Sequence, residues 1–335
     1  MKYTILLCLA PWICMAEITP YKFKSYEEIQ SMNYDIPSSS IGVAPRKNPK
    51  SPDITYYVSK PKTKTFPIVI LCGGSSTKES VSSIIHVHRY FLKELLERSF
   101  AVLTIEQWGV RGADINKDLF MQHYTRTQRL SDHIAVIEHL KKSQPRGWNG
   151  KFIFIGVSEG GDLVSPLTEI FSDITLATIN WSGAGDLGWR KELWPFIKNI
   201  RNSFTWWMNL LDILPGWAPF SLGIPKTEKD LDLALDKTLE NPTYEKEFLG
   251  MTYMYHSDAL TYPKPNYQKI KTPYLVVAGG QDPNIESSDA FVQKAKKSGM
   301  NITYFRIEDM DHYIRKRPDI INQSLEWLDK KVDKK

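Results

Sequence analysis

Hydrophobic residues from position 53 onward follow two alternating patterns. Continuous hydrophobic runs predict buried strands at 66–72, 100–106, 150–156 and 174–183, after a half-exposed strand at 53–59. Segments with hydrophobic residues three and four positions apart predict helices at 80–99, 126–143 and 159–172. Buried strands that alternate with helices indicate an α/β fold, in which helices cover both faces of a mostly parallel central sheet.

The alternation stops over 186–267 and then resumes. Beyond this interruption we expect strands at 272–282 and 301–309, and helices at 287–298 and 318–331. The interrupting segment is rich in Trp, Pro and Leu and has mostly helical periodicity. It predicts a helical insertion within one core, which is built from residues 53–185 and 268–335.

The N-terminus has the organisation of a secretory signal peptide. Lys2 precedes a short hydrophobic run, and a small-x-small pattern ends at Ala16. We therefore expect cleavage of residues 1–16 after Ala16, a secreted or periplasmic protein, and an N-terminal arm over 17–52. An uncleaved amphipathic anchor is the alternative. Cleavage would leave Cys72 as the one cysteine, which excludes an intrachain disulfide.

The composition of the chain indicates which kinds of partner are not expected. The chain has 335 residues, 42% of them hydrophobic and 24% charged, which is typical of a globular protein. Its formal net charge is only +5, and no cluster of Lys and Arg alternates with aromatic residues, so nucleic acid is not an expected partner. His86 and His88 would lie about 200° apart on a helix, which disfavours a metal site. No metal or organic cofactor is expected.

The sequence Gly-Val-Ser-Glu-Gly-Gly follows the predicted strand at 150–156 and places Ser158 at a strand end. Asp282 and His312 follow two later strands, and functional groups collect at the carboxyl ends of parallel strands. A serine hydroxyl becomes a nucleophile when an imidazole accepts its proton and a carboxylate orients that imidazole. The three residues are therefore candidates for a catalytic triad. Asp186 is a rival for the acid, but Asp282 precedes His312 by a shorter interval.

The glycines around Ser158 suit a sharp turn that presents the hydroxyl. The turn also places Ser158 before a helix, where the backbone N–H of Glu159 can bind a developing oxyanion. A Glu159 carboxylate pointing at that oxyanion would oppose it. We therefore expect this side chain to face away, or alternatively to bind a polar or cationic group of the substrate.

These features resemble the α/β-hydrolase fold superfamily, in particular serine esterases, lipases and relatives of dienelactone hydrolases. The G-x-S-x-G pattern is similar to the nucleophile elbow of that fold, and the order Ser, Asp, His matches its triad. The resemblance implies a second oxyanion donor in the loop after 66–72, for which Gly74 and Ser75 are the candidates. It also implies that 186–267, inserted after the sixth strand, forms a helical cap over the site.

Several tryptophans in this segment, including Trp206 and Trp207, are candidates to line a hydrophobic acyl pocket or to touch lipid. The alternative is that these rings form a hydrophobic core for the cap itself. The expected partner is a small-molecule ester or a lipid-like substrate, with peripheral membrane contact through the cap as a further option. The oligomeric state is left open.

The resulting hypothesis is an exported serine hydrolase that cleaves carboxylic esters through an acyl-enzyme. Serine peptidases and acyl-thioesterases share similar elbows, so both reactions remain alternatives within the same fold. A non-catalytic binding protein on a hydrolase scaffold is an alternative of a different class, although a complete triad disfavours it.

Overall fold

The computed structural model describes residues 41–48, 50–183, 185–205, 208, 212 and 223–332. Three sequence predictions lie outside these residues: the signal peptide at 1–16, the part of the N-terminal arm before position 41, and Trp206 with Trp207.

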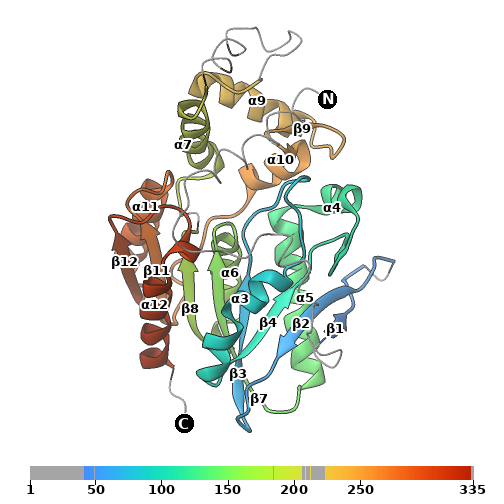
Figure 1. Ribbon diagram of the computed structural model, residues 1–335, viewed down its shortest axis with the longest axis vertical. Helices are drawn as coiled ribbons and strands as arrows, with labels where there is room; N and C mark the ends of the chain where they lie inside the picture. Colours follow the sequence, from blue (N-terminus) through green and yellow to red (C-terminus); the bar gives the residue numbers. More distant parts are fainter. Residues whose placement is uncertain are drawn as a thin grey trace.

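The main feature is a sheet of eight strands (Figure 1). Its strands run, from one edge to the other, in the order β1 (Ile41–Ala44), β2 (Ile54–Ser59), β4 (Ala101–Ile105), β3 (Phe66–Cys72), β7 (Trp148–Val157), β8 (Thr175–Trp181), β11 (Tyr274–Gly279) and β12 (Ile302–Ile307). The pairs β1–β2 and β2–β4 are antiparallel, and every other neighbouring pair is parallel. The predicted α/β class with a mostly parallel sheet is confirmed.

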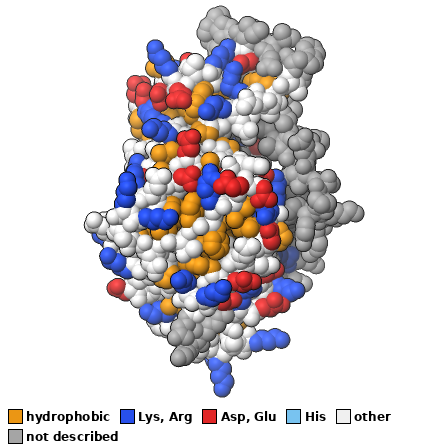
Figure 2. Space-filling model, turned by 90° about the vertical axis from the view of Figure 1, so that its left-hand side faces the viewer, with side chains coloured by type: hydrophobic (Ala, Val, Ile, Leu, Met, Phe, Trp, Pro, Cys, Tyr) orange, Lys and Arg blue, Asp and Glu red, His pale blue; other side chains and the backbone are white. Residues whose placement is uncertain are grey.

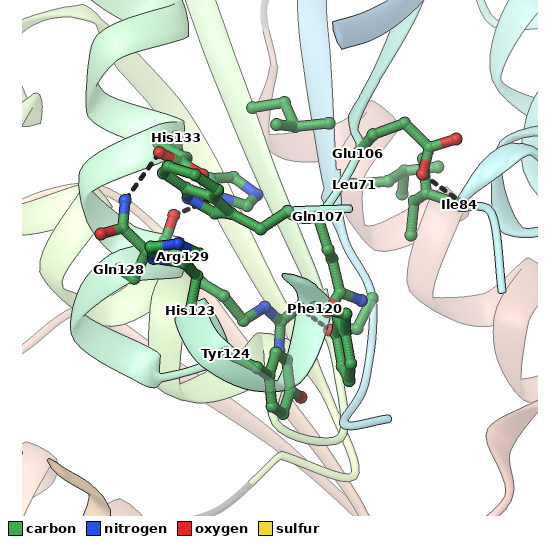
Figure 3. A pocket seen from close by; sticks show the side chains of 14 residues that line it. Leu71, Ile84, Glu106, Gln107, Phe120, His123, Tyr124, Gln128, Arg129 and His133 are labelled. Carbon is green, nitrogen blue, oxygen red and sulfur yellow. Dashed lines mark hydrogen bonds between the residues drawn. The ribbon is translucent and has the colours of Figure 1, made fainter. Parts of the chain in front are cut away.

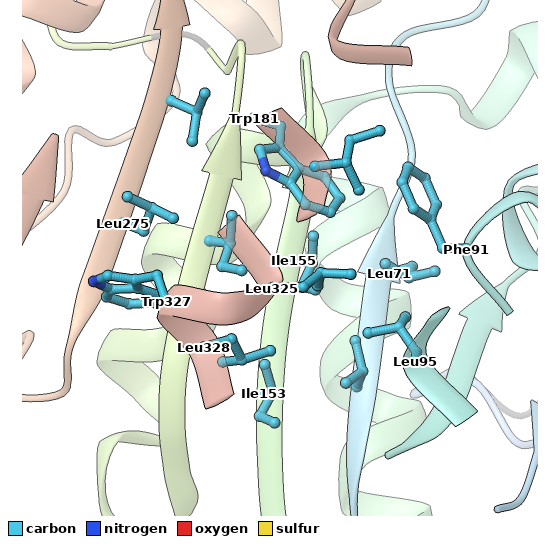
Figure 4. Packing of buried hydrophobic residues seen from close by; sticks show 14 of the residues in the cluster. Leu71, Phe91, Leu95, Ile153, Ile155, Trp181, Leu275, Leu325, Trp327 and Leu328 are labelled. Carbon is cyan, nitrogen blue, oxygen red and sulfur yellow. The ribbon is translucent and has the colours of Figure 1, made fainter. Parts of the chain in front are cut away.

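Alternate side chains of each central strand face opposite layers of helices, because successive residues of a strand point to opposite faces. In β3, Val69 and Leu71 pack in the layer of α3 (Ile85–Glu97) and α12 (Pro318–Lys331) (Figure 4). Ile68 and Ile70 pack in the opposite layer. That layer contains α5 (Arg126–Ser143) and α6 (Gly160–Ile170), and next to them α11 (Ile285–Lys297) packs on β11.

The described part of 186–267 is mainly helical and lies beyond one end of the sheet (Figure 1). It follows β8, the sixth strand of the sheet in chain order. Its elements are α7 (Trp189–Asn202), α9 (Glu228–Glu240), the short hairpin of β9 (Glu247–Phe248) and β10 (Met251–Thr252), and α10 (Tyr253–Thr261). These elements share a hydrophobic cluster that includes Ile197, Leu231 and Leu235. They therefore have a core of their own.

Two local features differ from the sequence predictions. The edge strand β1 lies within the expected N-terminal arm, and four residues that include a glycine carry too little pattern to predict a strand. Helix α3 begins at Ile85 and not at Ser80, because Ser80 and Val81 belong to a turn in which their N–H groups donate to the carbonyl of Thr77.

The side of the molecule shown in Figure 2 carries charged side chains of both signs, with hydrophobic side chains between them. On the edge strand β12, Arg306 forms ion pairs with Asp289 and Glu308, and such charges disfavour pairing with another strand. Within the part of the chain that the structure describes, no helix is both long and hydrophobic enough to cross a membrane.

Candidate active site

Ser158 occupies a tight turn between β7 and α6. Its φ of 53° lies in the left-handed region, which a residue with a side chain rarely adopts. The turn is held by the Ser158 N–H, which donates to the carbonyl of Trp181 over 2.9 Å, and by the Gly161 N–H, which donates to the carbonyl of Ser158 over 2.8 Å. A Cβ atom at Gly160 would lie 2.1 Å from the carbonyl oxygen of Cys72. Position 160 therefore requires glycine for this close approach of the helix to β3.

The structure brings Ser158, His312 and Asp282 together. The Oγ of Ser158 lies 2.9 Å from Nε2 of His312, and Nδ1 of His312 lies 2.8 Å from Oδ2 of Asp282. Asp282 is 4% exposed, and its Oδ1 accepts a hydrogen bond from the Asn284 N–H over 2.9 Å. Because the carboxylate can only accept, Nδ1 of His312 carries the proton and Nε2 is free to accept the proton of Ser158.

The neighbouring carboxylates have other partners. Asp186 is buried and forms an ion pair with Lys294, while its backbone carbonyl accepts from Lys264 over 2.7 Å. Asp309 pairs with Arg317 over 2.9 Å, and Asp311 pairs with Lys316 over 2.5 Å. The geometry therefore favours Asp282 over Asp186 as the partner of the imidazole.

Gly74 lies in the loop that follows β3, directly beside the serine. A Cβ atom at Gly74 would be 3.2 Å from Cβ and 3.7 Å from Oγ of Ser158. Among the described residues, no hydrogen-bond acceptor is paired with the backbone N–H of Gly74, Ser75 or Glu159. These N–H groups remain available to bind negative charge near Ser158.

The Glu159 side chain faces away from the hydroxyl, as expected, but into a buried ionic cluster. Its carboxylate accepts from Arg129, from the Tyr124 hydroxyl over 2.8 Å, and from the Tyr255 hydroxyl. Burial alone would raise the pKa of Glu159, but Arg129 and then Arg126 hold that pKa below its ordinary value. The cationic partners of Glu159 are thus internal arginines. Sequence reasoning missed Arg129 and Tyr124, since neither lies in a recognisable motif.

The inserted segment reaches the candidate site through α7. The ring of Phe196 meets the imidazole of His312 edge-on, with 5.6 Å between ring centroids and an interplanar angle of 86°. Trp189 instead donates its indole N–H to Nδ1 of His256 over 3.0 Å, and Trp194 packs within the cluster of the inserted segment. Trp194 therefore serves the core of this segment, whereas Trp189 also packs against a second cluster that contains Phe120 and Tyr124.

A small cavity of about 20 Å³ is lined by residues that include Gly73, Tyr124 and Arg129 (Figure 3). Neither Ser158 nor His312 lines it, and its volume suits about one water molecule, so it is not a substrate pocket. In the described ranges, no three His, Cys, Asp or Glu side chains gather in a way that could hold a metal ion.

The chain resembles known proteins in its three-dimensional structure but not in its sequence. No family model and no curated protein sequence matches the chain. Among solved structures, a thermostable carboxyl esterase from Bacillus coagulans is 16% identical with a TM-score of 0.56, and the match covers 87% of this chain and 96% of the esterase. Est1E from Butyrivibrio proteoclasticus with bound ferulic acid is 18% identical with a TM-score of 0.52, covering 83% and 95%.

The acylaminoacyl peptidase of Pyrococcus horikoshii is 14% identical with a TM-score of 0.53. The match covers 88% of this chain but only 41% of the peptidase, so the chain spans about two fifths of that protein's length. The shared feature of these proteins is the arrangement of sheet and helices described above. The chain therefore has the α/β-hydrolase fold.

Proposed function

We propose that the chain is a serine hydrolase that cleaves carboxylic esters, with Ser158 as nucleophile, His312 as base and Asp282 as the acid that orients His312. The observation that carries this proposal is the continuous hydrogen-bond chain from Ser158 through His312 to Asp282, with distances of 2.9 and 2.8 Å. The fold shared with carboxylesterases supports the same reaction class.

In the proposed reaction, Oγ of Ser158 attacks the ester carbonyl carbon while its proton moves to Nε2 of His312. The carbonyl oxygen becomes an oxyanion, which accepts hydrogen bonds from the N–H of Glu159 and of Gly74 or Ser75. His312 then returns the proton to the leaving alcohol, and the acyl group stays on Ser158. Water, deprotonated by His312, attacks the acyl-enzyme and releases the acid.

The segment 186–267 is proposed to act as a cap that supplies the substrate-facing surface. Phe196 is the described residue of this segment that contacts His312, and an aromatic ring at that place favours a hydrophobic acyl or alkyl group. Trp206 and Trp207 remain candidates for the same surface, as does peripheral contact with a membrane. In this proposal, residues 53–185 and 268–335 form the two parts of the hydrolase core, and residues 186–267 form the cap.

Export belongs to the proposal as well. The pattern ending at Ala16 supports cleavage by a signal peptidase and a secreted or periplasmic location. Sequencing the N-terminus of protein recovered from the medium or periplasm should give Glu17 as the first residue. Recovery of unprocessed chain in the cell pellet would contradict export.

A serine peptidase is the second candidate, since the fold is shared with an acylaminoacyl peptidase and the same three residues could cleave an amide. The two candidates differ in the leaving group that His312 must protonate. Turnover of p-nitrophenyl esters of graded chain length, with aminoacyl-anilides assayed alongside, separates them.

A fluorophosphonate probe tests the serine hydrolase itself. We expect the native protein to be labelled, and Ser158→Ala to lose both labelling and ester turnover while its melting temperature changes little. Ser165→Ala is a matched control on α6, the helix that follows the Ser158 turn, because Ser165 bonds the Tyr274 hydroxyl and not His312. A folded native protein that is not labelled would favour a non-catalytic binding protein.

A further inference from the structure

The two backbone segments proposed to bind the oxyanion are joined by a single guanidinium. Arg129 lies on α5, and its Nη1 donates to Oε1 of Glu159, the residue directly after the nucleophile. Its Nη2 donates to the carbonyl of Gly73 over 2.7 Å, directly before Gly74. Figure 3 shows the Arg129 side chain extending toward Tyr124. One rigid, planar cation thus bridges the elbow and the loop.

Tyr124 makes a second bridge between the same segments. Its hydroxyl donates to Oε1 of Glu159 over 2.8 Å and accepts from the Ser76 N–H over 3.0 Å. Gly73 and Ser76 flank the two candidate donors Gly74 and Ser75. The loop is therefore held on both sides of its free N–H groups by side chains that also hold Glu159.

Burial makes these bridges stiff. Arg129 is 7% exposed, Glu159 5% and Tyr124 3%. Opening the buried Arg129–Glu159 pair would separate two desolvated charges and leave Glu159 with the longer contact to Arg126, at 3.8 Å, so the pair resists opening. Since catalysis is sensitive to displacements of about 1 Å, a stiff connection between two oxyanion donors has a direct consequence for rate.

We propose that Arg129, Tyr124 and Glu159, together called the bridging cluster, are positioning residues that set the distance between the two oxyanion donors. They act through the backbone of 73–76 and of Glu159 and do not touch the substrate. This inference rests on the proposed serine hydrolase function and adds to it the residues that hold the oxyanion site in shape.

The chain contains a matched control for this inference. The hydroxyl of Tyr255, on α10, donates to the other oxygen of Glu159, and its ring stacks on Tyr124 with 5.3 Å between centroids and 2° between planes. Both tyrosines are buried and both bind Glu159, but only Tyr124 also binds the loop. Tyr124→Phe and Tyr255→Phe therefore each remove one hydroxyl bound to Glu159, and differ in the link to Ser76.

The experiment compares kcat and KM for a p-nitrophenyl ester, the inhibition constant of a trifluoromethyl ketone, and the melting temperature. The ketone forms a hemiketal oxyanion with Ser158, whereas the ground-state ester does not. For Tyr124→Phe we expect kcat to fall about 10- to 100-fold with KM nearly unchanged, and the ketone to bind more weakly by a similar factor. Tyr255→Phe should keep kcat within about threefold of the native value. Its melting temperature should fall by about as much as that of Tyr124→Phe, because each variant loses one hydroxyl bound to Glu159.

The outcomes separate the two levels of the proposal. If ester turnover depends on Ser158 but Tyr124→Phe and Tyr255→Phe have equal kcat and equal ketone affinity, the bridging cluster is overturned and the hydrolase stands. If Ser158→Ala retains native turnover, both are overturned. Arg129→Lys is a second variant, which keeps the positive charge but loses the planar guanidinium with its two hydrogen bonds. It should raise the inhibition constant of the ketone by a larger factor than it raises KM.

Discussion

At the scale of single residues, the candidate site depends on a serine held in an unfavourable backbone conformation. Ser158 has a positive φ, and its N–H and carbonyl are both engaged by the neighbouring backbone. Strained residues of this kind persist when the surrounding structure over-determines them, and they concentrate at functional sites. The close approach of Gly160 to Cys72 shows how tightly the turn is packed against β3.

The role of the Asp282 carboxylate in orienting His312 can be tested by substitution. Asp282→Asn preserves the shape of the side chain but presents an amide to His312, which disturbs the tautomer in which Nδ1 carries the proton. We expect kcat for ester hydrolysis to fall about 10³- to 10⁴-fold with little change in KM. Steady-state kinetics on a p-nitrophenyl ester measure both constants.

Asp186→Asn serves as its comparison, because Asp186 pairs with Lys294 and not with the imidazole. That substitution should lower stability while kcat stays within about threefold of native. A larger loss of kcat in Asp186→Asn than in Asp282→Asn would reverse the assignment of the acid.

At the scale of elements, helix α7 uses two different faces to contact the hydrophobic cluster of the inserted segment and the candidate site. Leu193 and Ile197 are four positions apart, so they lie on one face and pack in the cluster of the inserted segment. Phe196 lies about 100° around the helix from Ile197 and meets His312 instead. One helix thereby connects the core of the insertion to the candidate site.

Removal of the Phe196 ring tests whether α7 contributes to substrate binding. Phe196→Ala should lower kcat/KM for p-nitrophenyl butyrate about tenfold, mainly through KM, because a hydrophobic contact with the acyl chain is lost. The acetate ester, with a shorter acyl chain, should change less. Phe204→Ala is the control, since Phe204 packs in the cluster of the inserted segment without an observed contact to His312. If kcat/KM changes by the same factor for both esters and in both variants, Phe196 does not contribute to substrate binding.

At the scale of the whole molecule, several histidines are buried in their neutral form. Burial lowers the pKa of His88, His133 and His256 to about 4 each. His88 hydrogen-bonds Ser59 and Thr104, His133 bonds the Arg129 carbonyl, and His256 bonds the Phe248 carbonyl. These residues lie in different parts of the fold, so their protonation acts on global stability.

These three histidines should therefore lower stability as the pH drops from about 6.5 toward 4, whereas Asp162, whose pKa burial raises to about 7, acts in the opposite direction. In this interval the unfolded histidines, with an ordinary pKa near 6.5, bind protons that the folded ones do not, so unfolding takes up protons. Each histidine should contribute a loss on the order of 1–2 kcal/mol by pH 5. Urea unfolding at pH 7 and pH 5 measures the difference.

His88→Gln should show a smaller loss of stability over the same interval, because one of the three titrating groups is gone. A loss of stability between pH 7 and pH 5 that is equal in His88→Gln and in the native protein would contradict a contribution of His88.

Much of the fold could be predicted because its signals are local. The run Phe66–Cys72 is a strand with the predicted bounds, and α5 and α12 begin and end where periodicity places them. The contact between Ser158, His312 and Asp282 was also predictable, since each residue follows a strand of the same parallel sheet and such strand ends converge at one edge. Local patterns in the chain were thus enough to predict the α/β architecture and the contact among the three side chains.

Which distant side chains meet around that edge could not be predicted from local patterns, because it depends on how the elements pack in three dimensions. Arg129 and Tyr124 lie 30 and 35 positions before Glu159, and no spacing in the chain marks their pairing with it. The separation of Asp186 from His312, and the contact of Phe196 with that ring, likewise follow from how helices pack on the sheet. The physical reason is that periodicity reports which face of an element is buried, whereas the partner across that face is set by the packing of the whole molecule.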